Sequence, residues 1–400
     1  MNIAIIGCGI AGPAAALFLK QSGIDVTVFD KVADLKPVGA GFLLQPAGLD
    51  VLNQLGLAQS LLKKGAIVSG LQGHNHKGKM VLDLRYADLV SWHTGLGMAR
   101  PVLYEELYQA MIARNIQIIH PCDIQEIDNN QDRVLLKNSE GRVFGPYDCV
   151  IIADGCRSTL RHYLPVSIQV KPYKWGALWA IGKDTHQQFG SVLEQQYKHT
   201  EIMTGMLPMG HEDNNLLLSF FWSLHEDCYQ NWLNTPFSEW REQVSEFWPK
   251  LKLFLTQFHS HQDFTFARYA DINMYPWHHQ RVVAIGDAAH GMSPQLGQGA
   301  NLALIDACIL SDCLQQSPVT QALSTYSQTR KSQLHFYQNA SRFVTPWFQS
   351  SSHLMGLLRD QFHGLFCRTP VIRKQMLLTL ACMKNGYFSA TDLNKFSKFF

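Results

Sequence analysis

The stretch that decides the fold is residues 282–304, VVAIGDAAHGMSPQLGQGANLAL. Its first four residues are all apolar and predict a short buried strand. Gly286 and Asp287 end that strand, a turn of small residues follows, and from about Asn301 the apolar residues recur at helical spacing. The Asp287 carboxylate can accept hydrogen bonds from sugar-type hydroxyls, and the free N–H groups at the helix start can face an electron-rich ring edge. The stretch therefore predicts a ligand site between a strand and a helix.

A second strand–loop–helix unit begins almost at the first residue. Residues 2–6 are predicted to form a buried strand, and residues 7–12, GCGIAG, place three glycines at the spacing Gly-x-Gly-x-x-Gly before a predicted helix. In this motif Gly7 permits the tight turn, Gly9 lets the backbone approach a pyrophosphate, and Gly12 lets the helix pack closely on the strand. The motif in this context predicts a bound dinucleotide.

An acidic residue stands where the dinucleotide motif requires one. The predicted strand 25–29 ends at Asp30, 18 residues after Gly12. An acid at about this distance binds ribose hydroxyls, and its charge disfavours the 2′-phosphate of NADP. FAD and NAD therefore remain for this pocket. Asp30 concerns only the adenosine ribose of the bound dinucleotide, so it leaves open whether a co-substrate is NADH or NADPH.

Two further motifs lie between these units. Arg100 opens a predicted helix, and the apolar run 149–153 ends at Asp154, with Ser158 and Arg161 following. A guanidinium suits a pyrophosphate because its fork donates two hydrogen bonds at once. Taken alone, Arg100 fits a surface ion pair as well, and Asp154 fits a helix cap.

Together these motifs resemble one family, the FAD-dependent aromatic hydroxylases. These are single-component flavoprotein monooxygenases with the para-hydroxybenzoate hydroxylase fold, and the chain is similar to the ubiquinone-pathway hydroxylases among them. The motifs occur in the family's order over about residues 2–330. The resemblance implies an α/β fold with a Rossmann-type FAD-binding domain, an interleaved antiparallel-sheet substrate domain and C-terminal helices.

The resemblance also assigns residues to the flavin. Arg100 contacts the FAD phosphates, Gly286 and Asp287 hold the ribityl chain, and the Pro-x-x-Gly-x-Gly-x-Asn segment lies beside the isoalloxazine ring. A glycine-rich turn, strand and helix over residues 38–57 place Gln45 near the flavin, although Gln45 fits a plain surface position equally well. The predicted FAD contacts are Gly7, Gly9, Ala11, Gly12, Asp30, Gln45, Arg100, Asp154, Gly286, Asp287, Pro294, Gly297, Gly299, Ala300 and Asn301.

The motifs divide the chain into four segments. Residues 1–166 and 271–340 carry the flavin motifs and are expected to form the two parts of the FAD-binding domain. Residues 167–270 lack them and hold six of the nine tryptophans, which predicts a substrate-binding β-sheet domain. Residues 341–400 predict a helical segment with apolar and basic residues. That segment fits packing on the chain's own domains, a dimer surface or an interfacial helix on a membrane.

The substrate residues are less determined by sequence than the flavin residues. Met206, Phe220 and Trp222 are candidate walls of a substrate pocket, and each also fits an ordinary core position. No catalytic residue is predicted. His93, His211 and Tyr269 could serve as a base, but they are no better candidates than other surface or core residues.

The composition argues against several classes of protein. The net charge is +2 without a basic block, which does not suggest a nucleic-acid partner. The nine cysteines lack a CxxC pair and the 17 histidines form no HExxH motif, so we expect a reduced, cytoplasmic protein without a metal site. We expect no signal peptide and no membrane span. Peripheral membrane contact and the choice between monomer and homodimer stay open.

The activity implied by the resemblance is that of an FAD-dependent monooxygenase. It would use NADH or NADPH and O2 to hydroxylate an aromatic or related small organic substrate through a flavin hydroperoxide. Two alternatives remain from sequence. One is an epoxidase or reductase of a non-aromatic or prenyl substrate on the same fold, and the other is a non-catalytic FAD-binding partner subunit.

Overall fold

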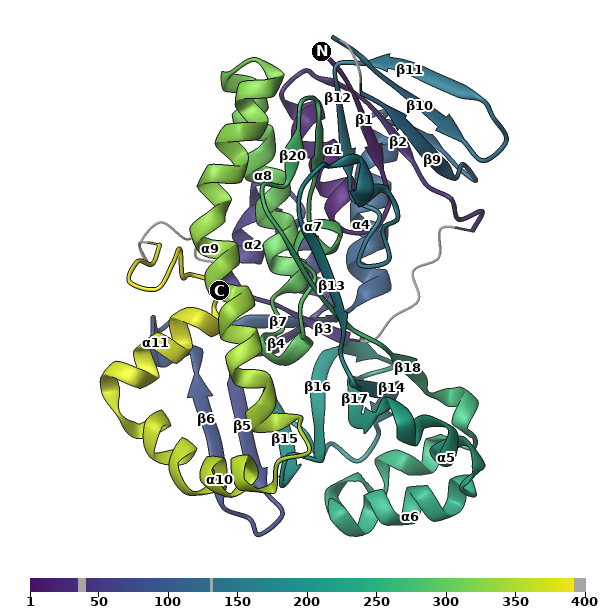
Figure 1. Ribbon diagram of the computed structural model, residues 1–400. Coiled ribbons are helices and arrows are strands. Elements are labelled where there is room, and N and C mark those ends of the chain that lie inside the picture. The colour runs from purple at the N-terminus through teal and green to yellow at the C-terminus, as the bar shows by residue number, and fades with distance from the viewer. Residues whose placement is uncertain (35–40, 130–131, 392–400) are drawn as a thin grey trace.

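Figure 1 shows a computed structural model of the protein, which describes residues 1–34, 41–129 and 132–391. Its upper part is built on a six-stranded sheet in the order β20-β21-β12-β1-β2-β8. These strands are β20 (His278–His279), β21 (Val282–Ala284), β12 (Cys149–Ile152), β1 (Asn2–Ile6), β2 (Asp25–Phe29) and β8 (Gln117–Ile119). All pairs are parallel except β20 with β21. A parallel sheet is covered on both faces, which explains why its strands are continuous apolar runs.

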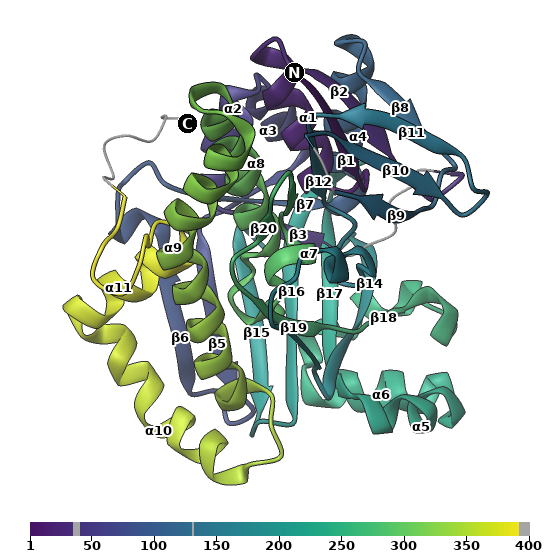
Figure 2. The same ribbon diagram turned by 45° about the horizontal axis from the view of Figure 1, so that its top comes forward.

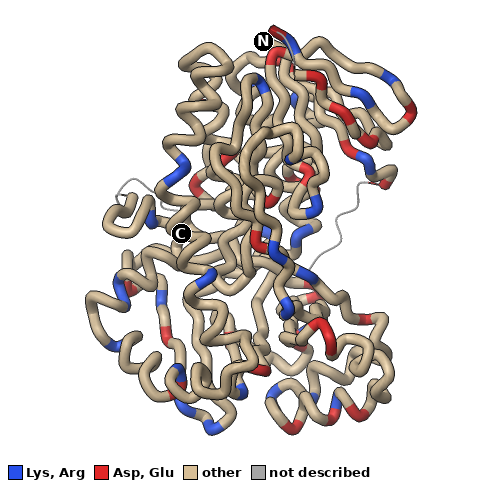
Figure 3. The backbone as a smooth tube through the Cα atoms, in the orientation of Figure 1, with Lys and Arg blue, Asp and Glu red and all other residues tan. Residues whose placement is uncertain are grey.

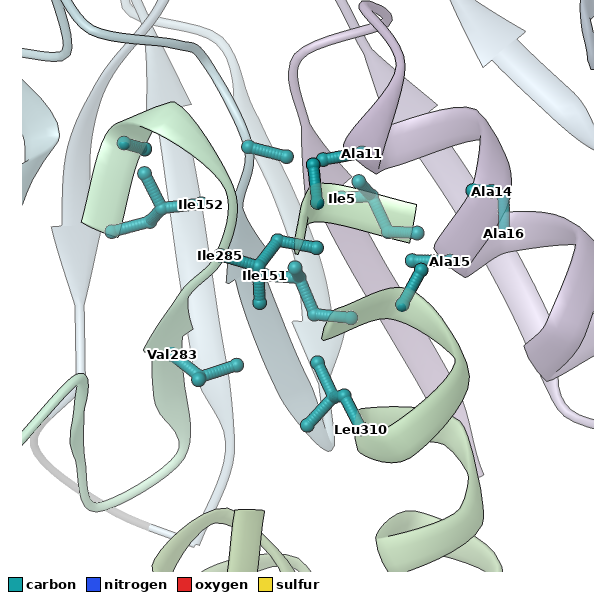
Figure 4. Close-up of a cluster of buried hydrophobic side chains, with 14 of the residues drawn as sticks. Ile5, Ala11, Ala14, Ala15, Ala16, Ile151, Ile152, Val283, Ile285 and Leu310 are labelled. Carbon is teal, nitrogen blue, oxygen red and sulfur yellow. The ribbon is translucent and has the colours of Figure 1, made fainter. Parts of the chain in front are cut away.

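Two helices from distant parts of the chain pack together beside this sheet. They are α1 (Ala11–Gln21) and α8 (Gly299–Gln316). Figure 4 shows Ala14, Ala15 and Ala16 of α1 and Leu310 of α8 gathered around isoleucines of the sheet. The small alanines let the helix approach closely. This packing brings the starts of α1 and α8 to the carboxyl ends of the central strands, where ligands bind in open α/β sheets.

Further elements complete the upper part. A three-stranded antiparallel sheet, β9 (Ile124–Asp128), β10 (Val134–Asn138) and β11 (Val143–Tyr147), projects to one side. The helices α2 (Pro46–Gln54), α3 (Ala58–Lys64), α4 (Arg100–Ala113) and α9 (Val319–Phe348) surround α1 and α8. The predicted strands at 2–6, 25–29 and 282–285 are confirmed to within one residue, and the helix expected from Asn301 begins at Gly299.

The lower part is a seven-stranded sheet in the order β18-β14-β17-β16-β15-β5-β6. Its strands are β18 (Thr265–Ala267), β14 (Trp175–Asp184), β17 (Asn215–His225), β16 (Ile202–Glu212), β15 (Val192–Lys198), β5 (Gly70–Asn75) and β6 (Met80–Arg85). Segment 1–166 therefore contributes two strands to this sheet as well as to the flavin sheet. The helices α5 (Tyr229–Asn234) and α6 (Phe237–Phe247) bury an aromatic cluster against one face.

Two small sheets connect the upper and lower parts. The first is β3 (Gly41–Leu44), β7 (Gly95–Ala99) and β4 (Ala66–Val68), and β7 packs on β16. The second is the ribbon of β13 (Ile168–Pro172) and β19 (Ala270–Met274), and β19 packs on the short helix α7 (Asp287–His290). Both connections meet the loops that carry the predicted flavin residues.

The chain ends in two helices that lie against β6. They are α10 (His353–Arg368) and α11 (Pro370–Leu380), and Figure 2 shows them along the outer edge beside β5 and β6. Because α9 extends to Phe348, it crosses the predicted boundary at residue 340. None of the helices in the described part of the chain combines the length and hydropathy that a membrane crossing needs.

Candidate active site

The glycine loop after β1 leaves room for a ligand at one position and none at the other two. Gly7 has φ of +110°, and a Cβ there would lie 2.4 Å from the Ala153 carbonyl oxygen. A Cβ on Gly12 would lie 1.9 Å from the Gly7 oxygen. At Gly9, by contrast, no described atom lies within 4 Å of the position of a Cβ. The loop is therefore closed toward the protein and open at Gly9, where the motif places a pyrophosphate.

Asp30 stabilises this loop from the end of β2. One carboxylate oxygen accepts a hydrogen bond from the Cys8 amide at 2.7 Å, and the other accepts one from the Val32 amide at 2.9 Å. Each carboxylate oxygen can accept a further bond. Asp30 can therefore hold the loop in place and still accept hydrogen bonds from ribose hydroxyls.

The segment after β12 provides a buried carboxylate and a brace. The Asp154 Oδ1 atom is buried without a hydrogen-bond partner among the described residues, and burial raises the pKa of the Asp154 carboxyl. The Arg161 guanidinium is also buried, and it donates hydrogen bonds to backbone carbonyls of its own loop and, at 2.6 Å, to the Ala288 carbonyl. Arg161 therefore joins the β12 loop to α7, whereas Asp154 retains an unused acceptor.

The loop before α8 brings two chain segments to the same point. Gly286 has φ of +60°, and a Cβ there would lie 3.1 Å from the Ala11 Cβ. Asp287 begins α7, and its Oδ1 lies 3.5 Å from the position of a Cβ on Gly299. Neither α1 nor α8 has a side-chain cap or an acidic residue in its first turn. Their first N–H groups are thus available to a ligand that carries negative charge.

Asn301 fixes the position of Gln45. The Asn301 Oδ1 accepts a hydrogen bond from the backbone N–H of Gln45 at 2.8 Å, and the Asn301 Nδ2 donates to the backbone carbonyl of Leu43 at 3.1 Å. The surface alternative for Gln45 is wrong, because its side chain is fully buried and accepts a 2.6 Å hydrogen bond from the Tyr86 hydroxyl. The Gln45 Nε2 is buried without a partner among the described residues, so it can donate to a bound group. Residues 38–40 of the predicted turn lie outside the described residues.

The remaining predicted flavin residues frame the same region. Pro294 begins a single 3-10 turn (Pro294–Leu296), and Gly297 follows it with the left-handed φ of +63°. Ala300 lies in the first turn of α8. Arg100 is the exposed first residue of α4. Burial raises the pKa of Tyr269 to about 12, although its hydrogen bond to Trp179 and the charge of Arg100 oppose that rise.

A buried ionic network behind the Gly286 loop was not identified from sequence. Asp306 accepts hydrogen bonds from the Gly286 amide at 2.9 Å and from Arg330 Nε at 2.7 Å, and it lies 2.5 Å from His290 Nε2. Burial by itself would raise the pKa of Asp306, but His290 and Arg330 together lower it. The available signal was Asp306, an acid between the apolar residues Ile305 and Ala307 in the first half of α8. The network holds the loop that carries Asp287.

The three predicted pocket residues lie on the face of the seven-stranded sheet that α5 and α6 cover. Met206, Phe220 and Trp222 belong to the closed aromatic cluster under α5 and α6. Strand side chains alternate between the two faces, so the neighbouring residue Phe221 points the other way. All three side chains are buried, which fits the core alternative for these positions.

The opposite face of that sheet adjoins the predicted flavin residues. Trp179 and Phe221 lie there with ring centroids 5.1 Å apart, and the Trp179 indole N–H donates to the Tyr269 oxygen at 3.0 Å. On the same face, the Ser219 hydroxyl accepts a hydrogen bond from the Gly41 amide of β3 at 3.1 Å. Strand β3 leads directly to Gln45. This aromatic face, defined by Trp179, Phe221 and Tyr269, is therefore next to the candidate flavin site.

The three candidate bases differ in their surroundings. Burial lowers the pKa of His93 to about 4, which leaves its imidazole neutral at pH 7. His211 is exposed at the end of β16. Tyr269 belongs to the aromatic face, and its raised pKa keeps its hydroxyl protonated at neutral pH. In the described part of the chain, no group of three His, Cys, Asp or Glu residues could hold a metal ion.

Comparison with known proteins places this geometry in a family. Residues 1–335 match the family described as FAD binding domain. The chain belongs to this family. It is 24% identical over 365 residues to the 2-heptyl-3-hydroxy-4(1H)-quinolone synthase of Pseudomonas aeruginosa, covering 87% of this chain and 91% of that protein. It is 22% identical over 377 residues to the 6-hydroxynicotinate 3-monooxygenase of Bordetella bronchiseptica, covering 88% and 93%.

A solved structure with bound flavin shares the fold of this FAD binding domain protein. Klebsiella pneumoniae HpxO in complex with FAD and uric acid matches with a TM-score of 0.78 at 19% identity, covering 96% of this chain and 97% of that one. The predicted family resemblance, the α/β fold with an interleaved sheet, the FAD cofactor and the class of FAD-dependent monooxygenase are confirmed.

The residues present fit FAD. The open side of Gly9 and the uncapped start of α1 suit its pyrophosphate, and Asp30 suits its ribose. The buried Gln45 Nε2 and the uncapped start of α8 suit the electron-rich edge of its ring. Each of these groups is a donor or acceptor whose capacity the described residues leave unused.

Proposed function

We propose that this protein is an FAD-dependent monooxygenase that uses NADH or NADPH and O2 to hydroxylate a nitrogen-containing aromatic ring. The observation that supports it best is the aromatic face of Trp179, Phe221 and Tyr269 beside the candidate flavin site. A flat apolar substrate can stack on such rings, and aromatic pairs contribute about 0.5–1.5 kcal/mol beyond area burial. The names of the quinolone synthase and the hydroxynicotinate monooxygenase both contain a nitrogen heterocycle, which supports this substrate class.

The side chains of this face have separate tasks in the proposed reaction. The Tyr269 oxygen accepts the Trp179 indole N–H, so its own proton is available for an oxygen or nitrogen atom of the substrate. With a pKa of about 12, Tyr269 acts as a hydrogen-bond donor at neutral pH and not as a base. Trp179 and Phe221 exclude water from the reacting ring. Tyr269 therefore orients the substrate and the two other rings hold its plane.

The chain's contribution to flavin chemistry is electrostatic. When bound, FAD would accept hydride from the nicotinamide nucleotide and activate O2, which side chains cannot do. The amide N–H groups at residues 299–301, together with Gln45 Nε2, would stabilise negative charge on the pyrimidine edge of the ring. Asp287 would accept hydrogen bonds from the ribityl hydroxyls.

The test follows NADH and NADPH oxidation by the FAD-loaded protein together with O2 uptake and peroxide release. The compounds are an alkyl-4-quinolone, a hydroxynicotinate and 4-hydroxybenzoate, each supplied with 18O2. We expect a heterocyclic compound to stimulate oxidation about 10-fold or more and to gain one 18O atom. Nucleotide oxidation and a changed product without 18O would indicate a reductase. If neither nucleotide reduces the bound FAD with any compound, the protein is a non-catalytic FAD-binding subunit and the proposal fails.

We also propose a cytoplasmic location. All nine cysteines are free thiols, and five of them are buried. Such usage suits a reducing compartment. Cell fractionation with compartment marker enzymes tests this, and recovery outside the cytoplasm with oxidised cysteines would contradict it.

A further inference from the structure

Helix α10 turns its polar side toward the protein. The inward-facing residues are Gly356, Arg359, His363 and Cys367. The buried Arg359 guanidinium lies over the Tyr197 ring, 4.8 Å from its centroid, and the His363 Nδ1 lies 2.9 Å from the Val81 carbonyl oxygen. A surface helix normally buries its apolar stripe, so this orientation is the reverse of the usual one.

The other side of α10 is an exposed apolar stripe. Its members are Leu354, Leu357, Leu358, Phe362, Leu365 and Phe366, each between 37% and 64% exposed. Their spacing of three and four residues places them on one side of the helix. Val371 and Ile372 of α11 follow and are 72% and 38% exposed. We call these eight residues the α10–α11 apolar face. An exposed patch of this kind marks a surface that another molecule covers.

The surroundings of this face are basic. Of the four Lys or Arg in residues 353–374, Arg368 and Lys374 are exposed, Arg359 is buried, and Arg373 pairs with Asp88. The neighbouring hairpin ends add the exposed Lys77, Lys79 and Lys198. These ends adjoin α10, since the His199 and His353 rings lie 5.6 Å apart. Figure 3 shows several blue positions along the otherwise mostly tan α10–α11 region.

We propose that the α10–α11 apolar face docks the protein on an anionic lipid bilayer. The stripe would enter the boundary between headgroups and acyl chains, and the surrounding lysines and arginines would pair with lipid phosphates. A second copy fits this face less well. In a two-fold dimer the same face meets itself, which would bring the basic residues of both copies together. The proposal concerns binding alone and does not depend on the proposed hydroxylation.

Vesicle flotation tests the apolar part of this surface. The FAD-loaded protein is mixed with vesicles of phosphatidylcholine alone or of phosphatidylcholine with phosphatidylglycerol. The variant carries Leu357→Ser, Phe362→Ser and Leu365→Ser, all at exposed positions, so bound FAD and circular dichroism should not change. Its matched control carries Ile112→Ser, Leu135→Ser and Val143→Ser, which remove exposed apolar side chains from α4, β10 and β11, away from α10 (Figure 1). We expect the α10 variant to bind anionic vesicles about 10- to 100-fold more weakly, and the control to bind as the unchanged protein does.

A second pair of variants tests the charges. Arg368→Glu with Lys374→Glu should weaken binding to the anionic vesicles about 10-fold or more. Lys174→Glu with Lys252→Glu, which makes the same change in net charge elsewhere, should have little effect. Added salt should weaken binding of the unchanged protein.

Three results would overturn the proposal. The first is that the unchanged protein does not float with anionic vesicles. The second is that both serine variants lose binding equally, which would indicate adsorption without a defined face. The third is a concentration-dependent dimer in analytical ultracentrifugation that the α10 variant abolishes, with no vesicle binding, which would assign the face to a second copy of the chain. Loss of hydroxylation with vesicle binding retained would refute only the proposed function.

Discussion

Replacing Arg330 by Met should destabilise the protein and weaken its hold on FAD. Arg330 and Asp306 are both at most 1% exposed, and their atoms Nε and Oδ1 are 2.7 Å apart. Removing one partner of a buried ion pair costs about 3–5 kcal/mol, and here it leaves the buried Asp306 carboxylate with only His290 and the Gly286 amide as hydrogen-bond partners among the described residues. At an unfolding entropy of about 2.1 cal/mol/K per residue, this cost lowers the Tm by about 4–6 °C for a chain of 400 residues. Since Asp306 also holds the Gly286 amide, FAD affinity should fall by about 10-fold or more.

Thermal unfolding followed by flavin fluorescence and circular dichroism measures this effect, with FAD titration of the apoprotein beside it. The matched control is Lys137→Met, which breaks an ion pair to Glu126 whose side chains are 44% and 59% exposed. Exposed pairs contribute about 0–1 kcal/mol, so the control should change the Tm by about 1 °C or less. If Arg330→Met changes the Tm no more than the control does, the network does not support the loop. If the Tm falls but FAD affinity is unchanged, the network stabilises the fold without positioning Asp287.

Three further results are expected. Gly12→Ala should weaken FAD binding about 10-fold or more in equilibrium titration, because the new Cβ would lie 1.9 Å from the Gly7 oxygen. Unchanged affinity would mean that the loop can shift to accommodate the methyl group without weakening FAD binding. Trp179→Leu should raise the KM for the aromatic substrate about 10-fold with FAD affinity unchanged, whereas Phe220→Leu on the opposite face should cost about 1–2 kcal/mol of stability without a change in KM. The reverse pattern would place the substrate under α5 and α6. The loss of stability caused by Asp306→Asn should be largest above about pH 4, because the pKa of Asp306 in the folded protein lies below its unfolded value of about 3.9. The difference should shrink as pH falls below that value in urea unfolding, and a pH-independent difference would refute the ionised state of Asp306.

The flavin-binding half could be predicted because its signals are local. Gly7, Gly9 and Gly12 lie in one short loop; the backbone around Gly7 and Gly12 leaves no room for a Cβ, whereas Gly9 faces open space. The parallel strands are apolar along their whole length, since both faces are covered, and this pattern is independent of what covers them. Asp287 could be placed for the same reason, because it directly follows such a strand.

Predicting the substrate-binding residues requires knowing which side chains of a strand point toward which neighbouring element. Phe220 and Phe221 are adjacent and identical in type, yet one is core and the other belongs to the aromatic face. The sequence of an aromatic-rich strand does not show which of its two alternating sets of side chains points to the flavin, because both faces of this sheet are covered. The strands β5 and β6 were equally hidden, since they pair in the lower sheet although they lie in the first segment of the chain.

The sequence by itself determined the FAD-binding fold, the order of its motifs and the residues at the carboxyl ends of its strands. Tertiary structure alone decided how distant residues are joined: Asn301 to Gln45, Asp306 to Arg330, and the Trp179 indole to Tyr269. Tertiary structure also decided that the apolar side of α10 faces solvent. An apolar stripe predicts that one side of a helix is covered, but it does not show whether the rest of the protein covers that side. The physical reason is that backbone conformation and strand burial depend on neighbours along the chain, whereas facing and pairing depend on contacts between segments far apart in sequence.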